Sequence, residues 1–382
     1  MFGKYGEGGE TLPRVITLSV SRYRPELPQP GEGLDFLVGI HEEGTGVAWQ
    51  RNVTLDPAVE SSLLKDTADL YRWSLGLGLG PAEASKRVES VGRQLYESFI
   101  GPEGEEYLAG AEPTALLMAV DETILNLPWE LVRSERGVLS QSTPFGRIVS
   151  TRMVPRPGRD PLREDRIVRM LAVGDPTSDL TAALAELERV RGLAGPRGPF
   201  TVEVEVLEQE DASIGRFEKM VRGGDYDMIH FAGHARFDQS TPESSALQFA
   251  DGALTADDVL ELEWSQPPSL VFNSACESGR AAGGRRLADG ARHANGLASA
   301  FLAAGTAAYV GYFWPVSDVG AARFAEVFYE SLFMLENVGL ACREARRVCI
   351  DQLGDTGDLT GYSAVLFGDA ASDHRRDLAM AV

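Results

Sequence analysis

Strand-like and helix-like blocks alternate between residues 166 and 276. Four apolar runs have the length and composition of strands, and segments with helical periodicity separate them at 178–193, 212–222 and 255–262. In the first of these helices, Leu180, Leu184 and Leu187 form one apolar stripe. The strands are expected at "RIVRMLAVG" (166–174), "FTVEVEVLE" (200–208), "YDMIHFAG" (226–233) and "SLVFNSAC" (269–276). This alternation predicts an α/β sandwich with a mostly parallel sheet.

The chain before residue 154 predicts a smaller α/β lobe. Its expected strands are at 14–23, 34–40, 114–122 and 146–154, and its expected helices at about 56–75 and 82–100. The glycine run "GLGLG" at 76–80 precedes Pro81 and follows no clear strand, so we interpret it as a turn and not as a nucleotide-binding loop. The segment "VPRPGRDPLRED" (154–165) has three prolines and many charges, which favours an internal boundary there.

Charge and composition exclude several classes of partner. The 382 residues carry a net charge of −21, which repels nucleic acid and anionic membrane surfaces. The uncharged tract 293–317 is long enough to span a bilayer, but Gly305, Gly311 and Pro315 interrupt it. We therefore expect a buried helix at 297–304 and a buried strand at 307–313, and no direct contact with nucleic acid or membrane.

Cysteine usage predicts a protein of the reducing cytoplasm. The chain has three cysteines, and Cys342 and Cys349 are spaced to share one face of a late helix, where they would pack in the core. No spacing suggests a zinc cluster, and the odd count argues against a disulfide framework. The N-terminal residues lack the apolar segment of a signal peptide. We expect no cofactor and no metal.

Two strand-like runs each stop at a reactive side chain. His234 follows "YDMIHFAG", and Cys276 ends "SLVFNSAC". In parallel sheets ligands bind beyond the carboxyl ends of the strands, so these two side chains can meet. A histidine near a cysteine can make the thiolate available as a nucleophile. The backbone N–H groups of Ala235 and Cys276 could then donate hydrogen bonds to an oxyanion.

Each of these residues also has an ordinary structural interpretation. A single cysteine is more often a small buried apolar residue, and a strand-end histidine is often only hydrogen-bonded. Their joint placement favours catalysis. His230, four residues before His234, invites a zinc interpretation, but "HFAGH" lies on a strand and lacks the helix and glutamate of a metalloprotease motif. We expect His230 to be structural.

Five blocks of the chain carry a resemblance to a known family. The blocks are "LNLPWELV" (125–132), "IHFAGHARF" (229–237), "LTADDVLEL" (254–262), "SLVFNSACESG" (269–279) and "NGLASAFLAAGTAAYVGYFWPVSD" (295–318). In this order they resemble the CHAT family, caspase-like cysteine peptidases related to separase, and the resemblance runs from about residue 90 to residue 370. The segment "ACESG" is also similar to the nucleophile segment of legumain-type peptidases. Ala235 departs from the pattern, because many relatives have glycine there.

The resemblance implies a caspase-like three-layer sandwich with Cys276 as nucleophile and His234 as general base. Together with the pattern along the chain, it divides the sequence into four regions. These are an N-terminal β-rich and helical region (1–88), a non-catalytic lobe (89–160), a catalytic region (161–375) and a tail (376–382). The sequence shows no helical repeats of the kind often fused to CHAT domains, so we expect residues 1–88 or a separate protein to replace them in recognition.

The same resemblance implies a cytoplasmic endopeptidase that cuts a specific protein. That substrate could be a gasdermin-like or other effector in bacterial defence or programmed cell death, and a partner protein could activate the enzyme. Asp318 matches an aspartate near the basic substrate side chain of separase-like relatives, and Asp175 follows the first core strand, so both are candidates for binding a basic residue before the scissile bond. Asp175 could instead shape a turn before Pro176, and Asp318 could cap a helix beginning near 319.

Two other classes of function remain open from the sequence. A catalytically silent caspase-like scaffold could bind partners through the same loops, although it would need neither His234 nor Cys276. A nucleotide-binding α/β regulator is disfavoured because no glycine-rich phosphate loop follows a strand.

Overall fold

The computed structural model describes residues 14–23, 32–78, 80–149, 154–158, 166–281 and 296–371. The tail predicted at 376–382 and most of the boundary predicted at 154–165 lie outside these ranges. Within them, no helix combines the length and the apolar character needed to cross a membrane.

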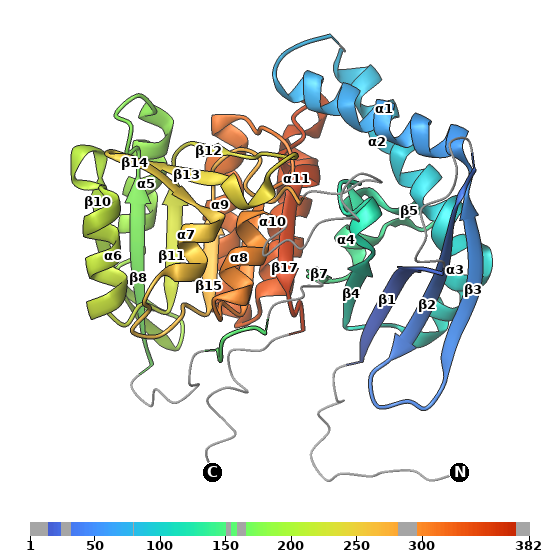
Figure 1. Ribbon diagram of the computed structural model, residues 1–382, viewed down its shortest axis with the longest axis horizontal. Helices are drawn as coiled ribbons and strands as arrows, with labels where there is room; N and C mark the ends of the chain where they lie inside the picture. Colours follow the sequence, from blue (N-terminus) through green and yellow to red (C-terminus); the bar gives the residue numbers. More distant parts are fainter. Residues whose placement is uncertain are drawn as a thin grey trace.

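One twelve-stranded sheet, most of whose neighbouring strands are parallel, runs through the molecule (Figure 1). This confirms the predicted fold class. In spatial order the strands are β3 (Ala48–Leu55), β2 (Leu34–Glu42), β1 (Val15–Arg22), β4 (Ala115–Val120), β7 (Phe145–Ile148), β17 (Ala364–Gly368), β16 (Ala308–Tyr312), β15 (Leu270–Asn273), β11 (Met228–Ala232), β8 (Ile167–Gly174), β10 (Phe200–Glu208) and β9 (Gly195–Arg197). Two small sheets accompany it, β12 (Ala235–Arg236) with β13 (Ala246–Phe249) and β14 (Gly252–Thr255), and β5 (Arg133–Ser134) with β6 (Gly137–Val138).

Helices cover both faces of the half of the sheet from β17 to β9. The helices α6 (Ile214–Gly223), α7 (Ala256–Glu261) and α8 (Leu297–Ala303) contribute to one apolar core, and α5 (Thr181–Arg191), α9 (Asp318–Leu335) and α10 (Val338–Leu353) contribute to the other. The short segments of this half are η4 (Gln209–Asp211), η5 (Pro242–Ser244), η7 (Gly354–Thr356) and α11 (Thr360–Ser363). The uncharged tract forms α8 and β16, as predicted.

The first half of the chain packs its helices into the core of β1, β2 and β4. These helices are α1 (Pro57–Ser74), α2 (Pro81–Leu95), the π-helical turn η1 (Tyr96–Ile100) and α3 (Gly101–Ala111), followed by η2 (Glu122–Ile124), η3 (Trp129–Leu131) and α4 (Leu139–Ser142). The glycine run lies between α1 and α2, with positive φ at Gly76 and Gly78, which agrees with the predicted turn.

A buried arginine joins the two halves. Arg147 on β7 pairs with Phe367 of β17 in the sheet, and its fully buried guanidinium donates to Glu130 of η3 at 2.8 Å from Nε. The guanidinium also lies 5.6 Å from the ring centroid of Phe313 and 5.8 Å from that of Phe367. The predicted lobes therefore share one sheet, and the buried guanidinium of Arg147 contacts aromatic rings of the catalytic region predicted at 161–375.

The apolar stripe predicted for the helix after β8 was misplaced. Leu187 is fully buried, but Leu180 precedes α5 as its N-cap and Leu184 is only partly buried. The buried face consists of Ala183, Glu186, Leu187 and Val190. A glutamate enters this face because it has a buried hydrogen-bond partner, as described below.

Candidate active site

His234 and Cys276 follow neighbouring parallel strands at equal distances. Phe231 of β11 and Asn273 of β15 are register partners, and each candidate residue lies three positions beyond its partner. The Ser274 N–H extends the ladder by donating to the Phe231 carbonyl at 2.7 Å. Both loops therefore leave the same carboxyl edge, which faces upward in Figure 1. Within the described residues no hydrogen bond links the His234 ring to the Cys276 thiol.

Buried polar contacts hold the loop of residues 274–279, which carries Cys276 and is called the nucleophile loop below. The Asn273 side chain is fully buried, donates to the Tyr309 hydroxyl at 2.8 Å and accepts from the Ala275 N–H at 3.1 Å. Ser278 Oγ donates to the Asn273 carbonyl at 2.8 Å, and Tyr309 donates to the Ser278 carbonyl at 2.9 Å. These contacts rigidify the turn that carries Cys276.

The small residues around Cys276 serve packing of the loop against β16. Ala275 and Ser278 are 1% exposed. A Cβ on Gly279 would approach the Gly311 carbonyl carbon to 3.0 Å, so only glycine fits there without a shift. These small residues allow a close approach between two backbones.

The Cys276 side chain is partly exposed, and its surroundings favour the neutral thiol. Burial raises the pKa of the Cys276 thiol, and the nearby carboxylates of Glu277 and Asp318 raise it further. The backbone N–H groups of Val316 and of Cys276 itself act in the opposite direction. The thiol is therefore protonated at neutral pH and needs a base before it can attack.

The His234 ring is held by a carboxylate that the sequence analysis did not single out. Nε2 of His234 lies 3.2 Å from Oδ1 of Asp179, and both side chains are exposed. Because a carboxylate only accepts hydrogen bonds, Nε2 carries the proton and Nδ1 is left as the basic nitrogen. The Thr177 hydroxyl donates to Asp179 Oδ1 at 2.5 Å. This hydroxyl and the interaction with the His234 ring lower the pKa of Asp179.

The Ala235 N–H is oriented away from its neighbouring strand. The His234 carbonyl accepts from the Gln248 N–H at 2.9 Å, and Ala235 is the register partner of Leu247. In an antiparallel pair hydrogen-bonded and non-hydrogen-bonded partners alternate, so the Ala235 amide points away from β13. That orientation is compatible with the predicted oxyanion role.

The two predicted substrate carboxylates differ in their surroundings. Asp175 is 2% exposed, has a φ of 46°, and its Oδ1 accepts from the N–H groups of Asp179 and Leu180 at 2.9 and 2.8 Å. These are the contacts of a turn-shaping residue. Asp318 is exposed in the first turn of α9, near enough to Cys276 to raise the pKa of its thiol. Asp318 is not the helix cap, because Ser317 Oγ accepts from the Gly320 N–H.

His230 lies inside the sheet, as expected of a structural residue. Its ring is fully buried and stacks on Phe272 at a centroid distance of 5.3 Å. Nδ1 is 3.0 Å from the Tyr329 hydroxyl, and Nε2 is 3.2 Å from Oε1 of Glu186. Oε2 of Glu186 accepts from Ser274 Oγ at 3.0 Å, which explains why a glutamate faces the core on α5.

The other two cysteines are placed as predicted on one buried face of α10. Cys342 and Cys349 are 0% and 1% exposed. Burial raises the pKa of both thiols, that of Cys349 to about 12. Neither is activated as a nucleophile.

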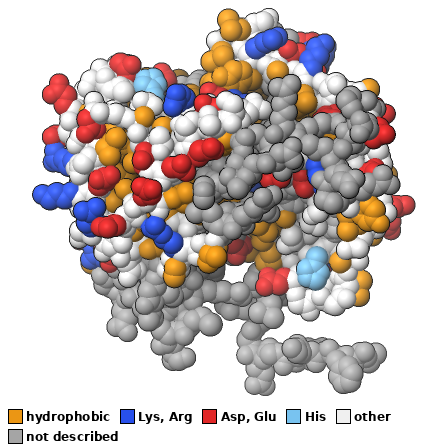
Figure 2. Space-filling view, viewed as in Figure 1, with side chains coloured by type: hydrophobic (Ala, Val, Ile, Leu, Met, Phe, Trp, Pro, Cys, Tyr) orange, Lys and Arg blue, Asp and Glu red, His pale blue; other side chains and the backbone are white. Residues whose placement is uncertain are grey.

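On one face of the molecule (Figure 2), the described residues form no single acidic patch. Figure 2 shows acidic and basic side chains interspersed over the face in view, so the charge of −21 does not gather into one acidic patch on that face. The charge therefore offers no specific binding surface there.

A mostly parallel sheet between two helical layers, with a cysteine and a histidine beyond its carboxyl edge, defines the caspase-like fold of cysteine peptidases. The chain belongs to the CHAT domain family, whose model matches residues 89–376. A search of curated proteins gives no match.

Among solved structures, the chain is similar to separase of Saccharomyces cerevisiae, in two crystal structures of the separase–securin complex at 3.0 and 2.6 Å resolution. The TM-scores are 0.59 and 0.53, the identities 11% and 12%, and 93% of this chain is covered in both. The match spans only 30% of the separase chain. The complex of the pro- and mature domains of RgpB from Porphyromonas gingivalis gives a TM-score of 0.48 at 14% identity, covering 82% of this chain and 77% of that one. The likeness to separase shows the fold.

Proposed function

We propose that the protein is a cysteine endopeptidase that cleaves a specific protein through an acyl-enzyme on Cys276. Nδ1 of His234 takes the proton from the Cys276 thiol, and the sulfur attacks the scissile carbonyl carbon. The negative charge that forms on the carbonyl oxygen accepts hydrogen bonds from the N–H groups of Ala235 and Cys276. Collapse breaks the C–N bond, and the leaving amine takes the proton from His234. Water, deprotonated by His234, then hydrolyses the thioester and releases Cys276 as a thiol.

Asp179 acts in this scheme as a positioning residue. Its carboxylate accepts a hydrogen bond from the Nε2–H group of His234, which leaves Nδ1 as the base. The observation that carries the proposal is the equal offset of His234 and Cys276 beyond the Phe231–Asn273 pair, because it brings a base and a nucleophile to one edge of the sheet.

In this proposal, the Cys276 thiol loses its proton only after a substrate or a partner protein has bound. The resting Cys276 is disfavoured as thiolate by burial and by two carboxylates. A substrate with a basic side chain would neutralise Asp318 and so remove one of these effects. An activating partner protein could close the distance between His234 and Cys276, since catalytic hydrogen bonds often form only in the complex.

We propose that Asp318 binds a basic substrate residue that precedes the scissile bond. Its carboxylate is exposed, close to the nucleophile and not used as the helix cap, so a guanidinium can pair with it. Asp175 is the weaker member of the predicted pair, because Oδ1 already accepts two backbone hydrogen bonds.

The substrate in this proposal is one dedicated cytoplasmic effector, with a gasdermin-like protein of a defence or cell-death system as the leading candidate. Support for this step comes from the family resemblance alone. Mass spectrometry of candidate effectors incubated with the wild type and with Cys276→Ala tests it. A fragment that forms only with the wild type supports the proposal. Equal fragmentation by both, or none by either, favours the alternative of a silent scaffold that binds partners through the same loops.

A further inference from the structure

The last turn of α1 contacts the nucleophile loop from outside the stretch that the family model matches. The Tyr71 hydroxyl donates to Oε2 of Glu277 at 3.3 Å, and Glu277 directly follows Cys276. The family model begins at residue 89, after α1. In Figure 1, α1 lies on the same side of the molecule as the carboxyl edge of the parallel strands.

Glu277 adopts a conformation that needs support. Its φ is 59°, in the left-handed region that non-glycine residues rarely adopt, and such conformations persist only when surrounding contacts determine them. One contact is the Tyr71 hydrogen bond, and another is a short ion pair with Arg280.

Arg280 also connects this turn to the loop after β11 that carries His234, called the histidine loop here. Its guanidinium carbon lies 5.4 Å from the ring centroid of Tyr71 and 4.7 Å from that of Phe237, three residues after His234. We call Tyr71, Phe237, Glu277 and Arg280 the loop clasp. The loop clasp joins α1, the histidine loop and the nucleophile loop.

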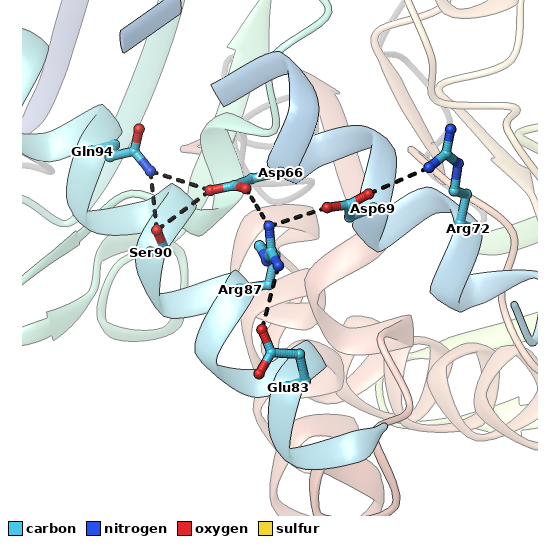
Figure 3. Close-up of polar contacts among 7 residues, drawn as sticks. All are labelled: Asp66, Asp69, Arg72, Glu83, Arg87, Ser90 and Gln94. Atoms are coloured by element: carbon cyan, nitrogen blue, oxygen red, sulfur yellow. Dashed lines mark hydrogen bonds and ion pairs between the residues drawn. The ribbon is translucent and has the colours of Figure 1, made fainter. Parts of the chain in front are cut away.

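Ion pairs fix α1 on α2, so that Tyr71 is not free to move away. Arg87 of α2 contacts Asp66 at 2.5 Å and Asp69 at 3.1 Å, both on α1, and reaches Glu83 at 3.3 Å (Figure 3). Asp66 is 8% exposed, which strengthens its interaction with Arg87. Ser90 and Gln94 add longer hydrogen bonds to Asp66, at 3.5 and 3.4 Å.

A second anchor lies just beyond Tyr71. The Trp73 indole N–H donates to the Gly357 carbonyl at 2.7 Å, so the end of α1 is also attached to the segment that follows α10. A Cβ on Gly357 would come within 2.8 Å of the Trp73 ring, and its φ is 81°, so glycine is required at this contact. With attachments on both sides, α1 places the Tyr71 hydroxyl at the nucleophile turn.

We propose that Tyr71 is a positioning residue that holds the nucleophile loop through Glu277, so that α1 controls the reactivity of Cys276. Tyr71 and Arg280 together restrict rotation of the Glu277 side chain and partly offset its negative charge. Without the Tyr71 hydroxyl, the charge beside the sulfur is less compensated and the turn loses one restraint. The thiolate is then harder to form. The proposal rests on the proposed function only for its catalytic consequence.

The test measures the rate of Cys276 alkylation by iodoacetamide in the full chain, followed by peptide mass spectrometry. We expect Tyr71→Phe to react about threefold to tenfold more slowly at pH 7, the loss of one hydrogen bond to a charged acceptor. Tyr96→Phe is the matched control, because Tyr96 makes the same kind of hydrogen bond, to Glu105 at 2.7 Å, elsewhere in the first half. Its rate should equal that of the wild type. Continued protection of Cys342 and Cys349 shows that each variant is folded.

A double-mutant cycle tests whether Tyr71 acts on Cys276 through Glu277. Glu277→Gln removes the charge beside the sulfur and should speed alkylation, and Tyr71→Phe should have little further effect in that background. A wild-type rate in Tyr71→Phe, or an undiminished effect of Tyr71→Phe in the Glu277→Gln background, would overturn the proposal.

Alkylation needs no substrate, so this test is separate from that of the peptidase function. If Cys276→Ala retains proteolysis, the proposed function fails while the loop clasp stands. If Tyr71→Phe changes neither alkylation nor kcat, the loop clasp fails while the peptidase stands. With an active substrate, the proposal expects kcat to fall and KM to stay constant in Tyr71→Phe.

Discussion

Nε2 of His234 lies 3.2 Å from Oδ1 of Asp179. The carboxylate selects the tautomer in which Nδ1 is basic, and an amide in its place could donate to Nε2 and move the proton to Nδ1. We therefore expect Asp179→Asn to lower kcat on the order of 10- to 100-fold, less than for a buried triad because this pair is exposed. Steady-state kinetics on a cleaved substrate measures it, and KM should change little.

Asp211→Asn is the control for that variant. Asp211 is also an exposed carboxylate paired with a cation, Arg216, but it contacts no candidate catalytic residue. Equal kcat values for Asp179→Asn and Asp211→Asn would show that the carboxylate does not position His234.

The three cysteines should differ in reactivity and in its pH dependence. Cys276 is partly exposed, whereas Cys342 and Cys349 are buried in α10, so iodoacetamide should modify Cys276 much faster in the native protein. Because the pKa of Cys276 is raised, its rate should increase with pH through a midpoint above the usual value of about 8.5. Glu277→Gln and Asp318→Asn should each lower that midpoint, since each removes a negative charge. Equal labelling of all three cysteines would contradict the assignment of Cys276.

Asp318 should determine a preference for a basic residue before the scissile bond. A peptide library varied at that position should be cleaved after Arg or Lys by the wild type, and Asp318→Asn should lose the preference. Asp355→Asn, at an exposed carboxylate after α10, should keep it. Cleavage by the wild type after Leu, Met or Asp would exclude this pocket.

The two neighbouring histidines should separate stability from catalysis. His230→Ala leaves a cavity and takes a partner from the buried Glu186, so we expect a loss of about 3–5 kcal/mol in the free energy of unfolding. His234 is exposed, so His234→Ala should change the free energy of unfolding by no more than about 0.5 kcal/mol while abolishing cleavage. Denaturant unfolding of both variants measures the contrast, and similar losses for the two would contradict these placements.

The order of apolar runs and turn residues along the chain predicted the elements that short segments determine. Strand ends placed His234 and Cys276 correctly, and glycine and proline positions divided the tract 293–317 into α8 and β16. Contacts between distant residues were not accessible in this way. Glu186 was missed on the buried face of α5 because its partner Ser274 lies 88 positions away, and nothing in "LYRWS" or "ACESG" marks Tyr71 as a neighbour of Glu277.

The position of Asp179 in the sequence carries a signal of its role. It lies four residues after Asp175, in the loop that leaves the carboxyl end of β8, where ligand-binding residues of such sheets occur. The helix cap is a similar case. Both Ser317 and Asp318 are residue types that cap helices, and only the position of the first helical residue decides between them.

The central claim, that Cys276 and His234 together cleave peptide bonds, is tested most directly with a proteome-derived peptide mixture. The wild type, Cys276→Ala, His234→Ala and the buried-thiol control Cys342→Ala are incubated with it, and new N-termini are identified by mass spectrometry. The account predicts new N-termini with the wild type and with Cys342→Ala, and none with Cys276→Ala or His234→Ala. The same new N-termini from Cys276→Ala as from the wild type, or none above background from the wild type, would contradict it.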